Sequence, residues 1–118
     1  MRSIRSSLAL LVALGACSSE APKQVVAGGD EARGRVYIER YGCASCHSGL
    51  PGAQGTVGPP LERIAHRAYL GGVLPNTPEN MAAWVSRPQR YAPGTAMPDL
   101  GISEAEARDI AAYLYTLR

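Results

Sequence analysis

The sequence predicts a small all-α domain with three to five short helices, and three observations support this prediction. The chain has 118 residues, a length that suits one domain. Several segments repeat apolar residues with helical spacing, whereas no segment alternates apolar and polar residues as a half-buried strand does. The 13 glycines and 9 prolines indicate that long loops join the helices.

The composition argues against several other classes of protein. A hydrophobic fraction of 46% is too high for a disordered chain. The formal net charge is only +2 and no Lys- or Arg-rich run exists, so we expect no nucleic-acid partner. Three cysteines cannot all pair within one chain, which argues against a disulfide-stapled mini-protein. With one Trp and no Phe, the protein core alone is modest.

The N-terminal segment, residues 1–16, has the features of a signal peptide. Two arginines precede an apolar run over residues 8–14, which is too short to span a membrane but fits an export signal. The following Leu14-Gly15-Ala16-Cys17 resembles a bacterial lipobox, and this resemblance implies that Cys17 is lipidated. The alternative is an ordinary signal peptide in which a cysteine falls at this position by chance.

Residues 17–29 are predicted to be the lipidated cysteine and a flexible tether. They contain Pro22, Gly28 and Gly29 and show no helical period. We therefore expect the folded domain, residues 30–118, to be exported. It would lie on the periplasmic side of a bacterial membrane, anchored through Cys17.

The first helix of the domain is predicted from Asp30 to Tyr41. Asp30 or Gly29 can cap its N-terminus, and Glu31 suits its first turn. Gly34 is expected to destabilise this helix by about 1 kcal/mol relative to Ala. The apolar residues that give this segment its helical spacing are Ala32, Val36 and Tyr37.

The segment that follows, residues 43–47, has the C-x-x-C-H pattern that attaches c-type haem. The thiols of Cys43 and Cys46 are spaced to form thioethers with the two vinyl groups of one porphyrin, and His47 is then placed to bind the iron. The rival interpretations are a thioredoxin-like redox pair and half of a zinc site. The first needs a preceding strand in a βαβ pattern and the second needs four ligands, and the sequence offers neither.

Two shorter helices are predicted in the middle of the domain. The first begins at Pro60, and its apolar face consists of Leu61, Ile64, Ala65 and Ala68. The second follows an N-cap at Asn76-Thr77, has Pro78 at its first position and must end before Pro88. Its apolar residues are Met81, Trp84 and Val85.

The last helix is predicted to begin after Ser103. Ser103 and Glu106 have the spacing of a capping box. The apolar residues then recur at positions i, i+3, i+4 and i+7, namely Ala107, Ile110, Ala111 and Leu114.

This order of elements resembles a class I cytochrome c. The resemblance implies the class I cytochrome c fold around one covalently bound haem c, with residues 30–118 as the cytochrome c domain. In the first helix, Gly34 would permit a close crossing of the last helix, and Tyr113 would meet it there. The family's Gly-Pro-x-Leu segment corresponds to residues 58–61. It implies that the Pro59 carbonyl accepts a hydrogen bond from His47 and that Leu61 packs near the ring.

The sixth iron ligand has three candidates, His66, Met81 and Met97. The family places its axial methionine in an irregular loop just before the last helix, a position that corresponds to Met97. Met81 lies on an amphipathic helix, where a methionine is more often core packing. His66 follows the Gly-Pro segment closely and would require its helix to move. The resemblance therefore implies that His47 and Met97 are the axial ligands.

Four stretches, residues 58–61, 74–80, 82–85 and 93–98, carry a closer resemblance. They resemble the cytochrome c domain fused to subunit II of some bacterial haem–copper oxidases. This resemblance implies that Arg67, Asn76 and Trp84 contact the haem propionates; the alternative is a solvated Arg and Asn beside a core Trp. No copper-binding domain precedes the haem domain in these residues, so we expect a haem domain rather than subunit II itself.

A haem with two protein ligands has no open iron position for a substrate, so the sequence predicts an electron-transfer protein and no enzyme. We expect a membrane-tethered one-electron carrier whose redox partners belong to a respiratory chain, with a terminal oxidase as one candidate. The alternatives are a five-coordinate or weakly ligated haem protein with ligand-binding or peroxidatic activity, and a fixed haem subunit of a larger oxidoreductase complex.

Overall fold

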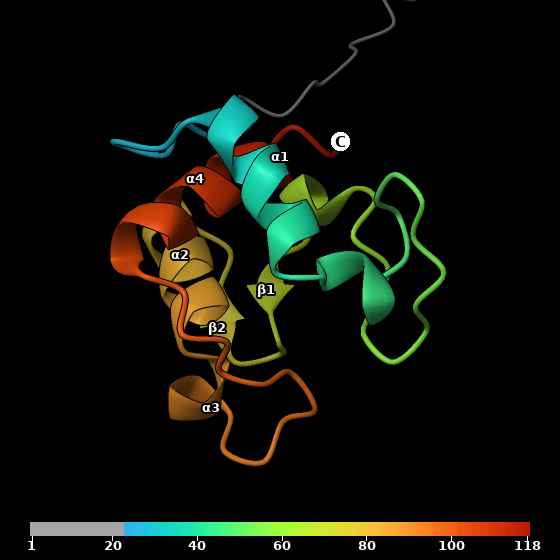
Figure 1. Cartoon of the computed structure of the whole chain (residues 1–118). Coiled ribbons are helices and arrows are strands. Elements are labelled where there is room, and N and C mark those ends of the chain that lie inside the picture. The colour runs from blue at the N-terminus through green and yellow to red at the C-terminus, as the bar shows by residue number, and fades with distance from the viewer. Residues whose placement is uncertain (1–22) are drawn as a thin grey trace, which may run out of the picture.

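The computed structural model describes residues 23–118, so the signal peptide and Cys17 lie outside the described residues. The helices are α1 (Glu31–Arg40), α2 (Pro78–Ser86), α3 (Pro88–Tyr91) and α4 (Glu104–Leu114). Short 3₁₀ turns are η1 (Cys43–Ser45) and η2 (Ile64–His66), and a small antiparallel pair is formed by β1 (Tyr69–Leu70) and β2 (Leu74–Pro75). In Figure 1, α1 crosses α4, and α2 packs against α4. The all-α prediction is confirmed.

The α1–α4 crossing depends on Gly34. A Cβ atom at this position would overlap the carbonyl oxygen of Asp109 and crowd the Cβ of Tyr113, so only glycine lets the two backbones come this close. The N-cap of α1 is Asp30, whose carboxylate accepts a hydrogen bond from the Arg33 N–H at 2.8 Å. The predicted cap and the predicted close crossing are both present.

The buried face of α1 differs from the one that the apolar spacing indicated. Ala32 is exposed and Val36 is 61% exposed, whereas Gly34 and Ile38 are buried. A hydrophobic pattern gives no weight to glycine, yet the bare backbone at Gly34 is where α4 approaches. The helix was therefore predicted correctly and Tyr37 packs against the core, but Ala32 and Val36 were wrongly assigned to its buried face.

The helix predicted from Pro60 does not form, and this segment is a loop that ends in η2. Arg63 has φ 60°, in the left-handed region, which a helix cannot contain. The Leu61 N–H donates to the Ser48 carbonyl at 2.8 Å, so the segment is tied across the loop instead of along a helix axis. Leu61 and Ile64 are nevertheless buried, which explains the misleading apolar spacing.

A short hairpin was not predicted by the sequence. Tyr69 pairs with Pro75 and Leu70 pairs with Leu74. The turn between them contains Gly71, whose φ of 54° suits a residue without a Cβ. Each strand has only two residues, too few to show any alternation of apolar and polar side chains.

The predicted ends of the later helices are confirmed. The Thr77 hydroxyl caps α2 by accepting from the Asn80 N–H at 3.2 Å, and Pro78 occupies the first turn. The helix ends at Ser86, before Pro88, and a further one-turn helix, α3, follows. At α4 the capping box of Ser103 and Glu106 is complete.

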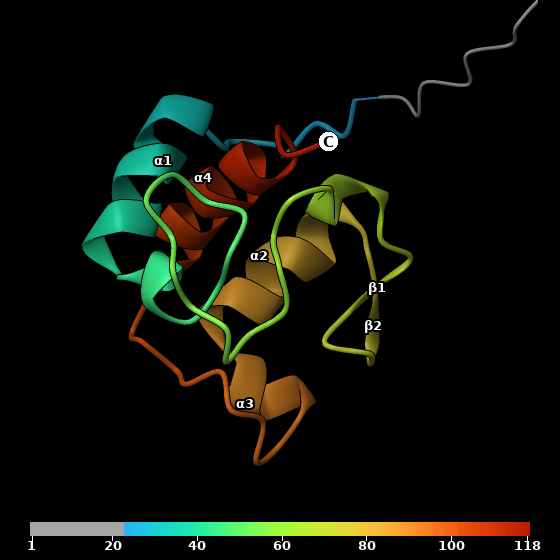
Figure 2. The same ribbon diagram turned by 90° about the vertical axis from the view of Figure 1, so that its right-hand side faces the viewer.

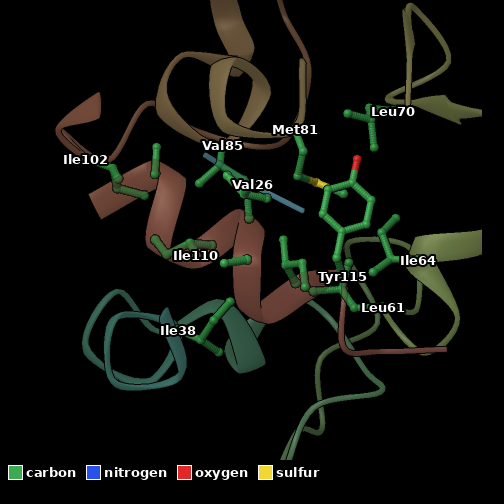
Figure 3. Close-up of a cluster of buried hydrophobic side chains, with 14 of the residues drawn as sticks. Val26, Ile38, Leu61, Ile64, Leu70, Met81, Val85, Ile102, Ile110 and Tyr115 are labelled. Atoms are coloured by element: carbon green, nitrogen blue, oxygen red, sulfur yellow. The ribbon is translucent and has the colours of Figure 1, made fainter. Parts of the chain in front are cut away.

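The core lies between α2, α4 and the segment around η2, as Figure 3 shows. Its most completely buried large side chains include Tyr115, Met81 and Ile110, each at 1% exposure. Burial raises the pKa of Tyr115 to about 12, so this phenol stays protonated in neutral solution and donates a hydrogen bond to Asn76 Oδ1 at 2.6 Å. Within residues 23–118, none of the helices has the length and apolar character to cross a membrane.

Candidate functional site: a cavity beside the C-x-x-C-H segment

The C-x-x-C-H segment forms a compact turn directly after α1. Gly42, with φ 68°, turns the chain, and η1 then begins at Cys43. The N–H groups of Cys46 and His47 both donate to the Cys43 carbonyl, at 3.2 and 3.0 Å. Both thiols are half-buried and free of any disulfide, and burial raises the pKa of the Cys43 thiol. These hydrogen bonds form a single short turn, which carries the two thiols and the imidazole.

The imidazole of His47 is oriented by the loop that follows. Its Nδ1 lies 2.7 Å from the Pro59 carbonyl oxygen. Since a carbonyl can only accept, Nδ1 carries the proton and Nε2 keeps its lone pair for a metal. Gly58 lies against the ring, and a Cβ atom there would overlap it. The loop therefore holds the ring in place and fixes its tautomer.

A cavity of about 300 Å³ opens beside this turn. Its lining is mostly apolar and comes from α1, η1, β1, α2, α4 and the loops between them. It includes eight of the residues that were predicted to attach, ligate or contact the haem, namely Cys43, Cys46, His47, Pro59, Leu61, Arg67, Trp84 and Met97, and also the alternative ligand Met81. The fold therefore brings the candidate thioether, axial and neighbouring residues to one cavity.

The three residues that were predicted to contact the haem propionates differ in their position relative to the cavity. Trp84 is half-buried in the cavity wall, close beside Gly71, where a Cβ atom would overlap the indole. Arg67 also lines the cavity, and its Nη2 donates to the Pro60 carbonyl. Asn76 is not part of the lining.

Asn76 instead braces the chain around the cavity. Its Nδ2 donates to the carbonyls of Ile64 (2.9 Å) and Arg67 (2.8 Å), while its Oδ1 accepts from Tyr115. Its polar atoms are thus engaged with protein groups. The structure therefore gives Asn76 a bracing role beside the cavity, and its contact with the haem propionates stays a prediction.

The three candidates for the sixth ligand are also separated by the fold. His66 is exposed and does not line the cavity. Met81 lines it but is 1% exposed on α2, within the core. Met97 is half-buried in the irregular loop between α3 and α4 and lines the cavity. Its thioether is therefore carried by a segment that regular secondary structure does not constrain.

Gln89 on α3 is a residue that the sequence analysis missed. Its Nε2 donates to the carbonyls of Thr95 (2.7 Å) and Met97 (2.8 Å), and its Oε1 accepts from the Gly94 N–H at 3.0 Å. A glutamine on a short polar helix gives no sequence signal for such contacts. Their partners are backbone groups, which every residue has.

Three exposed apolar side chains stand among the residues that line the cavity. Val57 is 71% exposed, Tyr69 is 59% exposed and Leu100 is 41% exposed. In Figure 2 the segments that carry them can be followed by colour: the green loop after η1, then β1, then the orange segment before α4. Each of the three side chains therefore borders the cavity and is exposed to solvent.

The residues present fit a covalently bound haem. Two thiols, an imidazole nitrogen free on Nε2 and a thioether sulfur are the donor set of a His/Met haem c site, and they line one mainly apolar cavity. Gly58 and Gly71 keep that cavity open on the sides of the His47 and Trp84 rings, because a Cβ atom at either position would overlap them.

Comparisons with known proteins agree with this site. Residues 32–118 match the cytochrome c family. The chain is 33% identical over 87 residues to cytochrome c oxidase subunit 2 of Alkalihalophilus pseudofirmus, which covers 73% of this chain but only 25% of that protein. It is 32% identical to cytochrome c2 of Rhodoblastus acidophilus over 101 residues, covering 75% of this chain and 92% of the relative.

Cytochrome c2 of Agrobacterium tumefaciens is likewise 32% identical over 102 residues, covering 73% of this chain and 90% of the relative. This chain spans about a quarter of the oxidase subunit and nearly the full length of both cytochromes c2. A family match over most of the chain, on an all-α fold with a C-x-x-C-H turn, leads to one conclusion. The chain belongs to the cytochrome c family, as a class I c-type cytochrome that carries electrons with covalently bound haem c.

Proposed function

We propose that Cys43 and Cys46 hold a single haem c, that His47 and Met97 are its axial ligands, and that the protein is a one-electron carrier of a respiratory chain. The observation that supports this most is that all four side chains line one cavity, with His47 Nδ1 engaged by Pro59. When bound, the haem supplies one-electron chemistry by alternating between ferric and ferrous iron.

The protein side chains restrict what such a site can do. His47 offers Nε2 because its Nδ1–H donates to the Pro59 carbonyl. Met97 would fill the remaining axial position and so exclude substrates. The apolar wall keeps water away from the site. With both axial positions filled by protein, electron transfer is the chemistry left to this site.

A spectroscopic experiment tests the axial ligation. We expect the oxidised wild-type protein to show the weak near-infrared sulfur–iron band, and the reduced protein to bind CO slowly. Met97→Ala should lose the band and bind CO rapidly. Met81→Leu is the matched control, since it removes the other cavity-lining thioether at little change in volume and should keep the band.

The opposite result would identify a different kind of haem protein. A wild type without the band and with fast CO binding would contradict the carrier proposal and favour a ligand-binding or peroxidatic protein. If Met81→Leu abolished the band and Met97→Ala kept it, the assignment of the sixth ligand would be wrong.

We further propose that the redox partner docks on the exposed apolar residues Val57, Tyr69 and Leu100, and that a terminal oxidase is the electron acceptor. Removal of residues 1–16 would take away two of the 12 basic residues and none of the 10 acidic ones, so charge steering is weak. Electron transfer to a purified oxidase should then slow with Leu100→Ser and change little between low and moderate salt. A steep salt dependence, or co-purification as a fixed subunit after detergent extraction, would contradict a mobile carrier.

The N-terminal part of the proposal is export and lipid anchoring through Cys17, which lies outside the described residues. The lipobox-like segment Leu14-Gly15-Ala16-Cys17 supports it. Metabolic labelling with a radioactive fatty acid should label the wild-type protein and leave Cys17→Ala unlabelled and released from membranes. A Cys17→Ala protein that still fractionated with membranes without label would show that another feature holds it there.

A further inference from the structure

The loop that carries Met97 has little backbone hydrogen bonding of its own. Among the backbone–backbone hydrogen bonds of residues 23–118, only the one from the Thr95 N–H to the Ala92 carbonyl (3.0 Å) involves residues 93–101. Every residue of the loop is at least partly exposed, so water competes for its carbonyls and N–H groups. Its conformation must therefore be set by side chains.

One side chain provides most of that restraint. The Gln89 amide donates both of its N–H groups to the loop, to the carbonyls of Thr95 (2.7 Å) and Met97 (2.8 Å). It accepts a third bond from the Gly94 N–H at 3.0 Å. A single primary amide thus spans four positions of the loop and binds the backbone of Met97 itself.

The backbone that carries the Gln89 side chain is also held in place. The Gln89 N–H donates to Asp99 Oδ1 at 3.1 Å, so the loop and α3 are joined in both directions. α3 begins at the buried Pro88, directly after α2. Beyond the loop, the buried Ser86 hydroxyl on α2 donates to the Ile102 carbonyl at 3.0 Å. Both ends of the loop are therefore tied to α2 and α3.

From this geometry we infer that Gln89 is a positioning residue for Met97. Its amide holds the loop in the closed conformation in which Met97 lines the cavity, and it thereby keeps external ligands from the iron. The inference rests on the proposed role of Met97 as axial ligand. A glutamate has the same shape but no N–H donors, and a leucine has neither donors nor acceptor, so either substitution leaves the carbonyls of Thr95 and Met97 without these partners.

The test is the binding of imidazole to the oxidised holoprotein. Opening of the loop must precede displacement of Met97, so the apparent affinity for imidazole rises with the fraction of open molecules. Loss of two donated hydrogen bonds should tighten imidazole binding by about tenfold or more in Gln89→Glu and in Gln89→Leu. Gln24→Glu, at an exposed position of the N-terminal segment, is the matched control and should bind imidazole as the wild type does.

A second measurement reports on the loop without any external ligand. Hydrogen exchange at the Gly94 N–H should be faster in Gln89→Leu than in the wild type and in Gln24→Glu, because leucine removes its acceptor. Exchange at Ile110, in the middle of α4, should stay the same, which would show that the fold is intact.

The outcomes separate the two proposals. An oxidised wild type without the sulfur–iron band overturns the axial role of Met97 and, with it, this inference. If the wild type has the band but both Gln89 variants bind imidazole within twofold of it, Gln89 does not position Met97, and only this inference fails. A lower melting temperature with unchanged imidazole affinity would likewise assign Gln89 a purely structural role.

Discussion

Asp109 is the buried carboxylate that joins the two ends of the chain. It is 4% exposed and accepts hydrogen bonds from the Asp30 N–H (2.8 Å) and from Arg33 Nε (2.8 Å) and Nη2 (3.0 Å). The pKa of Asp109 is lowered, chiefly by the hydrogen bonds from Arg33. Because its oxygens are satisfied by these donors, the buried charge is compensated.

The lowered pKa of Asp109 predicts how the free energy of unfolding depends on pH. Its pKa in the folded protein lies below that of the unfolded chain, so its stabilisation is complete above the unfolded value, about 3.9, and is lost as pH falls through the folded value. We expect Asp109→Asn to lower the free energy of unfolding at pH 7 by about 1–2 kcal/mol, at the low end because Arg33 is largely exposed to solvent. The difference from wild type should shrink in acid, as urea unfolding at several pH values would reveal.

Glu39→Gln is the control for that measurement. Glu39 is 69% exposed and its ion pair with Arg35 is 3.7 Å long, so its removal should change stability little at any pH. A deficit of Asp109→Asn that stayed constant between pH 7 and pH 3 would show that the lost contact is not the ionised carboxylate.

Single residues could be predicted where their role is encoded locally. Cys43, Cys46 and His47 lie at most four positions apart, and Ser103 with Glu106 is a local pattern too. The role of Gln89 could not be predicted, since its partners lie five to eight positions further along and are backbone groups. For Asn76 the propionate contact was implied only by resemblance, and no local pattern indicates its hydrogen bonds to the carbonyls of Ile64 and Arg67.

At the scale of elements, the capping box links two helices as well as starting one. The Glu106 N–H donates to Ser103 Oγ at 3.3 Å, and the Ser103 N–H donates to Glu106 Oε2 at 3.0 Å. The Tyr41 hydroxyl at the end of α1 donates to the same carboxylate at 3.0 Å. The pKa of Glu106 is lowered, chiefly by its hydrogen bonds from Ser103.

Ser103→Ala should therefore destabilise the protein by about 1 kcal/mol, the usual cost of losing an N-cap. Thermal unfolding followed by circular dichroism would measure it, with the exposed loop residue Thr56 changed to Ala as control. Equal melting temperatures for Ser103→Ala and Thr56→Ala would mean that the cap contributes nothing.

Helices were predicted correctly where the sequence contains both a capping residue and an apolar face. The prediction was wrong where the sequence contains the apolar face alone. α2 and α4 have both, and their N-terminal caps were predicted correctly. The segment after Pro60 has apolar residues at helical spacing but no cap, and its buried side chains serve a loop around the cavity. Spacing alone cannot distinguish these cases, because a 3₁₀ turn also brings residues three apart to one side.

At the scale of the whole molecule, the cavity beside the C-x-x-C-H turn shares its walls with the hydrophobic core. Its walls include Ile38, Leu61, Met81, Ile110 and Leu114, which are also members of the buried core. Without haem these walls would face an open space of about 300 Å³. A domain of this size has little core stability in reserve.

We therefore expect the haem-free Cys43→Ala/Cys46→Ala protein to be largely unfolded. Its far-ultraviolet circular dichroism should lack a cooperative thermal transition, and single substitutions at exposed sites such as Val36→Ala in the holoprotein should keep one. A cooperative, native-like melt of the haem-free double variant would contradict this expectation.

The crossing of α1 and α4 has a consequence for the time course of folding. Arg33 and Asp109 meet across 76 positions of the chain, so the contact that fixes the first helix is made by the last one. Contacts between such distant positions form slowly, because a large loop must close before they stabilise anything. The C-x-x-C-H turn, which directly follows α1, is thus accessible for as long as α4 has not docked. The slow closure of this distant contact leaves an interval in which haem can be attached to an open chain.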